Sequence, residues 1–163
     1  YSMVKALRVD ERLIHGQVAM AWTRDLGIQG IMVADDEAAS NEMQKMTLKM
    51  AVPDGIKCII KTVPEIIALL NNPRSEGMRI LVLVKTAKNA LEVYKAVPGI
   101  EYVNIGNAGR FTSGDGTERT IISRSVSLTP DEVEALKELA ALAPDTALQM
   151  VPSDEKKLVS EVL

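Results

Sequence analysis

Short apolar runs alternate along the chain with segments in which apolar residues recur every three or four positions. Such runs predict buried strands, and the helical spacing between them predicts amphipathic helices. The expected strands lie at residues 4–9, 30–34, 57–61, 79–84, 102–105, 120–123 and 147–151. Three expected helical faces are formed by Val18, Ala21, Trp22 and Leu26, by Met43, Met46, Thr47 and Met50, and by Ala87, Ala90, Leu91 and Tyr94.

Helix starts are marked by hydroxyl side chains that can cap the first turn. Thr62 with Glu65 forms a capping-box pattern, and Thr86 stands before another helical segment. Thr129 is followed by Pro130 at the first helical position, which favours a helix start there. Ser153 is expected to cap a terminal helix.

The repeated order of strand and helix predicts an α/β fold. Right-handed crossovers then give a single open, mostly parallel twisted sheet with helices on both faces. A chain of 163 residues fits one compact domain, and no linker or repeat divides it, so we expect a single domain over residues 1–163.

Composition narrows the function. The net charge of −3 and an aromatic content of 3% provide neither a basic field nor stacking platforms, which argues against nucleic-acid binding. The lone Cys58 lies in an apolar run and is expected in the core, and a reducing, cytosolic setting is the default. No apolar stretch approaches the roughly 20 residues of a membrane span.

The loop after the first strand, residues 10–16, is the expected functional loop, because ligands of open α/β sheets bind at the carboxyl ends of strands. His15, the only histidine, lies there. A neutral imidazole is nucleophilic and can accept a phosphoryl group. The helix start at Gly16 and Gln17 offers backbone donors for an anion, and Gly16 lets an oxygen approach the backbone closely.

Arg8 and Arg12 could supply charge-assisted hydrogen bonds to the same anion, with Asp10 orienting an arginine or the histidine. A structural interpretation stays open for each. Arg8 could instead pair with Asp10, and Arg12 could be a solvated loop charge. The apolar residues at 13–14 could be the first core residues of the helix or part of an apolar docking rim.

The stretch R-V-D-E-R-L-I-H-G-Q-V at residues 8–18 resembles the active-site motif of the IIB subunits of the mannose/fructose/sorbose family of bacterial phosphotransferase systems. Residues 48–55 are similar to that family's L-K-M-A-x-P-x-G segment. Residues 104–107 resemble its N-[IV]-G strand end, and residues 125–129 resemble its lead into a helix. The matches follow the family's order over about 120 residues, which makes the resemblance specific.

The resemblance implies a sheet of about seven strands and a phosphoryl carrier without cofactor or metal. His15 would take the phosphoryl group, on Nδ1, from a phosphohistidine of a IIA partner. The group would then pass to a sugar of the mannose, fructose, sorbose or N-acetylgalactosamine class. Transport would run through membrane IIC and IID subunits, which would hold this protein at the inner face of the membrane. The sugar and the oligomeric state, including a possible homo-oligomer, stay open, as does the role of the longer polar loop at residues 110–117.

Three rival functions are weaker on the residues. A histidine phosphatase generally pairs its nucleophile with a second histidine, which this chain lacks. A receiver-like domain would need an acidic pair after the first strand, but Asp35 and Asp36 follow the second and are expected to be helix-end charges. A dinucleotide-binding module would need a glycine fingerprint after the first strand, where only Gly16 stands.

Overall fold

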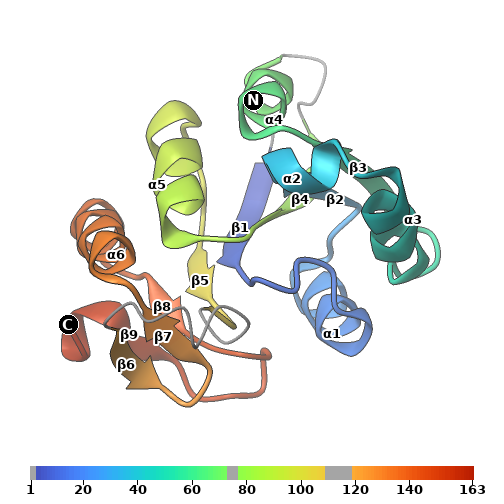
Figure 1. Cartoon of the computed structure of the whole chain (residues 1–163). Coiled ribbons are helices and arrows are strands. Elements are labelled where there is room, and N and C mark those ends of the chain that lie inside the picture. Colours follow the sequence, from blue (N-terminus) through green and yellow to red (C-terminus); the bar gives the residue numbers. More distant parts are fainter. Residues whose placement is uncertain (1–2, 73–76, 109–118) are drawn as a thin grey trace.

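One seven-stranded sheet organises the fold, with strand order β3-β2-β4-β1-β5-β8-β9 (Figure 1). The computed structural model describes residues 3–72, 77–108 and 119–163. All sheet pairings are parallel except β8 with β9. The strands are β1 (Met3–Val9), β2 (Gly30–Ala34), β3 (Lys57–Lys61), β4 (Arg79–Val84), β5 (Val103–Ile105), β8 (Ala147–Leu148) and β9 (Lys157–Leu158). The expected open, mostly parallel sheet is confirmed.

Helices cover both faces of this sheet, as the alternating pattern predicts. The helices are α1 (Gly16–Leu26), α2 (Asp36–Ala39), α3 (Glu42–Met50), α4 (Val63–Leu70), α5 (Ala87–Ala96) and α6 (Pro130–Leu142). Residues of α4, α5 and α6 bury one apolar cluster, while α1 and α3 contribute to a second cluster. Figure 1 shows α5 and α6 side by side, away from α1. No helix in the described part of the chain is long and apolar enough to cross a membrane.

The sequence-predicted helix starts are mostly confirmed by their caps. Thr62 and Glu65 form a complete capping box at α4. Thr86 accepts a hydrogen bond from the Asn89 N–H at α5, and Thr129 accepts one from Glu132 at α6. Each such cap is worth about 1 kcal/mol, because it satisfies an N–H that the first helical turn leaves unpaired.

The prediction of a terminal helix after Ser153 is wrong. A turn follows β8, and the chain continues into β9 and a short 3₁₀ helix, η2 (Val159–Glu161). Asp154 Oδ2 accepts a hydrogen bond from the Val151 N–H at 3.3 Å, so the polar cluster there closes a turn and caps no helix.

The sequence did not predict two further elements. The short helix α2 precedes α3, and β7 (Val126–Leu128) pairs with the expected β6 (Thr120–Ser123) as a separate antiparallel hairpin. This hairpin forms an isolated bridge with Ala108, which follows β5. The Ala108 N–H donates to Ser125 O at 2.9 Å. The polar loop at residues 110–117 lies outside the described residues.

The methionine face of α3 is not part of the core. Met43, Met46 and Met50 are 79%, 66% and 81% exposed, and only Leu48 of this helix is buried. They share one helical face as expected, and that face points to solvent.

The carboxyl end of β1 lies at a topological switch point. The chain leaves β1 for α1 on one face, whereas the neighbouring strand β4 is followed by α5 on the other face. Loops that diverge in this way open a crevice at the strand ends, where ligands bind in α/β sheets. The loop that carries His15 begins at this point.

Candidate functional site

The loop from Asp10 to His15 is held by backbone hydrogen bonds to the end of β4 and to the segment that follows β5. The Asp10 N–H donates to Val84 O at 2.9 Å, and the Glu11 N–H donates to Asn107 O at 2.8 Å. The Leu13 N–H donates back to Asp10 O at 2.9 Å, closing a tight turn. The loop is therefore fixed where it leaves the sheet.

Leu13 adopts a left-handed backbone conformation with φ of 59°, which costs an L-residue roughly 1–2 kcal/mol. Its side chain compensates by being buried in the cluster beneath α1, together with Ile14. Both side chains are core residues, so the alternative of an exposed docking rim is wrong for this pair. Their burial anchors the loop immediately before the histidine.

His15 follows this anchor and is exposed. It is the N-cap of α1, with extended backbone, and its side chain makes no capping hydrogen bond. The first intrahelical bond runs from the Ala19 N–H to His15 O at 2.8 Å. The N–H groups of Gly16 and Gln17 consequently lack helical partners. A Cβ added to Gly16 would meet nothing within 4 Å, so the space above it is open.

Asp10 is the centre of an ion cluster behind the loop and is 0% exposed. It accepts from Arg12 three times, at 3.0 Å each, through the backbone N–H, Nε and Nη2. It also accepts from Arg8 Nη2 at 3.2 Å. A buried carboxylate with two arginine partners is compensated in charge and in hydrogen bonds.

Arg8 is a buried bracing residue at 2% exposure. Besides Asp10, it donates to the side-chain oxygen of Asn104 and, at 3.0 Å, to Gln149 O. Its guanidinium lies 5.4 Å from the ring centre of Trp22. Burial lowers the pKa of Arg8, an effect that neighbouring Asp10 opposes. This geometry favours the structural interpretation of Arg8 as a partner of Asp10.

Arg12 is arranged differently. Its side chain is 22% exposed, and hydrogen bonding to Asp10 raises its pKa. Nε and Nη2 are occupied by Asp10, whereas no acceptor among the described residues bonds Nη1. Arg12 is thus a permanently charged group with donors to spare, and it is more than a solvated loop charge.

Three residues of the cluster carried no sequence signal for a site. Gln149 and Met150 follow β8, and the Met150 thioether accepts from Arg8 and Arg12. Trp22, expected only as a core residue of its helix, donates from Nε1 to Met150 O at 3.0 Å. Asn104 and Gly106 lie in a segment that the resemblance had picked out.

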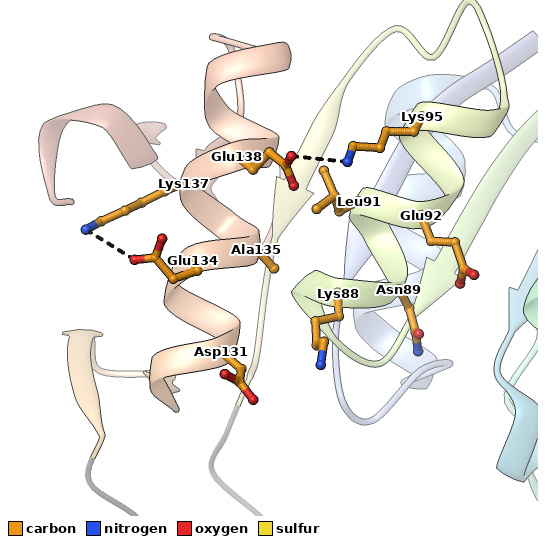
Figure 2. Close-up of a pocket in the computed structure, with 10 residues that line it drawn as sticks. All are labelled: Lys88, Asn89, Leu91, Glu92, Lys95, Asp131, Glu134, Ala135, Lys137 and Glu138. Carbon is orange, nitrogen blue, oxygen red and sulfur yellow. Dashed lines mark hydrogen bonds and ion pairs between the residues drawn. The ribbon is translucent and has the colours of Figure 1, made fainter.

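A groove of about 640 Å³ runs from His15 along α1, with residues 151–153 as its opposite wall. A larger hollow of about 1090 Å³ lies between α5 and α6 and contains none of the predicted site residues (Figure 2). Its charges include a pair across the helices, Lys95 with Glu138 at 3.1 Å. Exposed pairs of this kind contribute little, and the residues that line the hollow include no histidine, cysteine or hydroxyl side chain.

The acidic residues that a receiver-like site would use are engaged elsewhere. Asp35 caps α2 by accepting from the Ala38 N–H at 3.0 Å, and Asp36 accepts from the Val63 N–H at 2.9 Å. Lys85 pairs with Glu37 at 3.6 Å. Within the described ranges, no group of three or more metal-binding side chains comes together. The expectation that Asp35 and Asp36 are helix-end charges is confirmed.

Comparison with known proteins identifies the family. Residues 4–163 match the model of the phosphotransferase system (PTS) sorbose subfamily IIB component. The chain is 44% identical over 162 residues to a probable phosphotransferase enzyme IIB component of Streptococcus pyogenes, covering 99% of both chains. It is 34% identical to the sorbose-specific EIIB component of Lacticaseibacillus casei, covering 93% of this chain and 90% of that one. It also matches the mannose-specific EIIAB component of Escherichia coli at 29% identity, spanning 49% of that longer protein.

Solved structures show the same fold. The IIB domain of the sorbose permease from Klebsiella pneumoniae superposes with a TM-score of 0.88 at 26% identity, covering 98% of this chain and 94% of that one. The structure of manxB from Thermoanaerobacter tengcongensis has a TM-score of 0.84 at 33% identity, covering 99% and 96%. The chain therefore belongs to the sorbose subfamily of IIB components of the sugar phosphotransferase system.

Proposed function

We propose that this IIB component carries a phosphoryl group on His15, as one domain spanning the chain. The group comes from a phosphohistidine of a IIA partner and passes to a sugar of the mannose, fructose, sorbose or N-acetylgalactosamine class during uptake. The observation that carries the proposal is the exposed His15 at the N-terminus of α1, where its side chain makes no capping bond. Imidazole there is free to attack phosphorus.

The transfer is a displacement between two imidazoles. A ring nitrogen of His15 attacks phosphorus with its lone pair, a new P–N bond forms, and the P–N bond to the donor ring breaks. If the donor ring is protonated on its other nitrogen, it leaves as neutral imidazole, and the phosphorylated His15 ring carries the corresponding positive charge. Proton and charge therefore balance without a metal or an added base.

The surrounding groups stabilise the charge on the transferring phosphoryl oxygens. The Nη1 edge of Arg12 is the side-chain donor, and the N–H groups of Gly16 and Gln17 are the backbone donors at the positive end of α1. Asp10 holds the opposite edge of Arg12. Arg8 supports Asp10 from behind and contacts no phosphoryl oxygen in this scheme, since it is buried.

The partners follow from the carrier role. The E. coli mannose relative is named EIIAB, and this chain matches about half of its length. Accordingly, we propose a IIA protein or domain as the donor. Membrane IIC and IID subunits would bind the sugar and hold this protein in the cytoplasm at the inner face of the membrane.

The deciding experiment is labelling with a phosphorylated IIA protein of the same subfamily, followed by mapping of the modified residue. Wild-type protein should be labelled on His15, and His15→Ala should take no label while keeping its circular dichroism spectrum and Tm. His15→Gln serves as a second variant that retains polar volume. A folded variant that is still labelled would refute His15 as the acceptor.

A further inference from the structure

The thioether of Met150 lies between the two arginines of the site. Its Sδ is 3.6 Å from Arg8 Nη2 and 3.4 Å from Arg12 Nη2. These are the two nitrogens that also bind Asp10 Oδ2, at 3.2 Å and 3.0 Å. Each Nη2 carries two hydrogens, so each can serve the carboxylate with one and the sulfur with the other.

This second acceptor matters most for Arg12. Asp10 binds Arg12 along the Nε–Nη2 edge, but carboxylate contacts on a single edge leave a partly exposed side chain free to tilt. The contact from Nη2 to Met150 Sδ fixes the guanidinium from a different element, the segment after β8. The Nη1 edge, which bonds no acceptor among the described residues, is thereby given one direction, as a donor to a transferring phosphoryl group requires.

Sulfur suits this role because it is a weak, uncharged acceptor. A second carboxylate at the same place would neutralise Arg12 and compete with phosphoryl oxygens for it. A thioether restrains the guanidinium and leaves its positive charge to act outward.

Met150 is itself held in place from three sides. Its carbonyl accepts from Trp22 Nε1 at 3.0 Å. The preceding carbonyl, of Gln149, accepts from Arg8 Nη1 at 3.0 Å and from Asn104 Nδ2 at 2.9 Å. The Gln149 amide donates to Asp154 O at 2.8 Å, which pins the turn that follows. The sulfur is therefore presented by a fixed backbone.

We infer that Met150 is a positioning residue for phosphoryl transfer, acting through the guanidinium of Arg12. The inference rests on the proposed function for its kinetic consequence, although the positioning itself is a property of the free protein. Nothing in the motif around His15 points to it, since Met150 lies 135 residues further along the chain.

The test compares Met150→Leu, which keeps the volume but lacks the acceptor, with Met150→Gln, which restores an acceptor oxygen. Single-turnover labelling of His15 by phosphoramidate, a small donor that needs no docking surface, measures the rate. Met150→Leu should be slower by about fivefold, the scale of one ordinary hydrogen bond. Met150→Gln should return to within about twofold of wild type. The matched control is Met50→Leu on the exposed face of α3, which should change nothing.

A double-mutant cycle separates positioning from packing. In an Arg12→Ala background, Met150→Leu should have no further effect on the rate. An equal slowing in both backgrounds, an unchanged rate in Met150→Leu, or a Met150→Gln variant as slow as Met150→Leu would each overturn the inference. Trp22 fluorescence and Tm report whether each variant is folded. If Met150→Leu is not folded, the comparison of Met150→Gln with wild type still tests the inference.

A measurement that involves no phosphoryl transfer distinguishes this inference from the proposed function. The ¹⁵N-edited NMR signal of the Arg12 Nε–H should be sharp in wild type and Met150→Gln and broadened in Met150→Leu. If wild-type His15 takes no label but this pattern appears, the carrier function fails and the positioning stands. If His15 is labelled and the signal is sharp in all three proteins, the positioning fails alone.

Discussion

The guanidinium of Arg8 lies against the backbone of Gly106, so closely that a Cβ at Gly106 would overlap Nη2 and Cζ. Gly106 follows β5, and its N–H donates to Val9 O at 2.8 Å. The glycine is thus explained by the buried arginine that it accommodates, and its φ lies outside the left-handed region. This contact makes the strand end of β5 part of the site's support.

Gly106→Ala should therefore be destabilising. The added methyl must displace a guanidinium that is pinned by Asp10, Asn104 and Gln149, and such overpacking typically costs about 1–3 kcal/mol. Urea unfolding followed by Trp22 fluorescence measures the change. Gly16→Ala is the matched control, because a Cβ there meets nothing within 4 Å, and its free energy of unfolding should stay near that of wild type.

Arg8 should contribute mainly to the stability of the fold, and Arg12 mainly to the rate of phosphoryl transfer. Arg8→Met should lower the free energy of unfolding by about 3 kcal/mol or more, because it removes a buried partner from buried Asp10. Arg12→Ala should slow phosphoryl transfer by about 10²-fold, as loss of a preorganised donor does. Denaturant unfolding and single-turnover labelling give the two measurements.

Arg12→Lys refines this comparison. It keeps the charge but loses the planar fork that Asp10 grips, so its rate should fall between wild type and Arg12→Ala. Near-normal transfer in both Arg12 variants would return Arg12 to a purely structural role.

The chemistry of the phosphorylated bond should match imidazole. Protonation makes imidazole a good leaving group, so the labelled protein should lose phosphate in mild acid and keep it in alkali. The isolated IIA-to-IIB step should run at an undiminished rate with chelator present, since Arg12 and the start of α1 supply the positive charge. Acid and alkali treatment of ³²P-labelled protein provides the measurement. An alkali-labile label or a Mg²⁺ requirement would favour an aspartyl phosphate.

Glu132 should make stability depend on pH. Burial raises its pKa, although hydrogen bonds from the N–H groups of Ala87 and Lys88 partly oppose this. A raised folded-state pKa means that this contribution is fully present below the unfolded pKa of about 4.3 and is lost as pH rises through the folded value. Glu132→Gln removes the titration.

The free energy of unfolding of Glu132→Gln minus that of wild type should therefore increase between about pH 3.5 and about pH 7. Urea unfolding of both proteins at each pH gives the difference, in which most other titrating groups cancel. A difference that stays flat or declines over this range would contradict the raised pKa.

The sheet was predictable where the strands are central. Residues 30–34 and 79–84 form strands with the predicted boundaries, because parallel central strands bury both faces and read as apolar runs. The turn at residues 151–154 was not predictable. Ser153 and Asp154 look like a helix cap in sequence, but the buried Gln149 amide donates to Pro152 O and Asp154 O and fixes a turn there.

Part of the candidate site could likewise be predicted from the sequence, and part could not. His15 could be found because it is unique and stands at a strand end before a helix. The distinction between Arg8 and Arg12 could not, because both are arginines near one aspartate and only burial separates them. Met150 and Gln149 have no chemical signal of their own, since their role depends on packing beside β1 across more than 130 residues of chain.

That long separation has a consequence for the order in which the protein matures. Arg8 is bonded to Gln149 O, 141 positions later, so two distant segments must meet before the arginines of the cluster have all their acceptors. During synthesis β1 leaves the ribosome before β8, so its polar cluster lacks some of its partners until the segment after β8 has been made. Loop closure over such a distance is a late event in folding. A nascent chain that lacks this segment would thus present His15 on a loop whose Arg8 and Arg12 are without their acceptors Gln149 O and Met150 Sδ, and competence for transfer would be acquired only once that segment has folded.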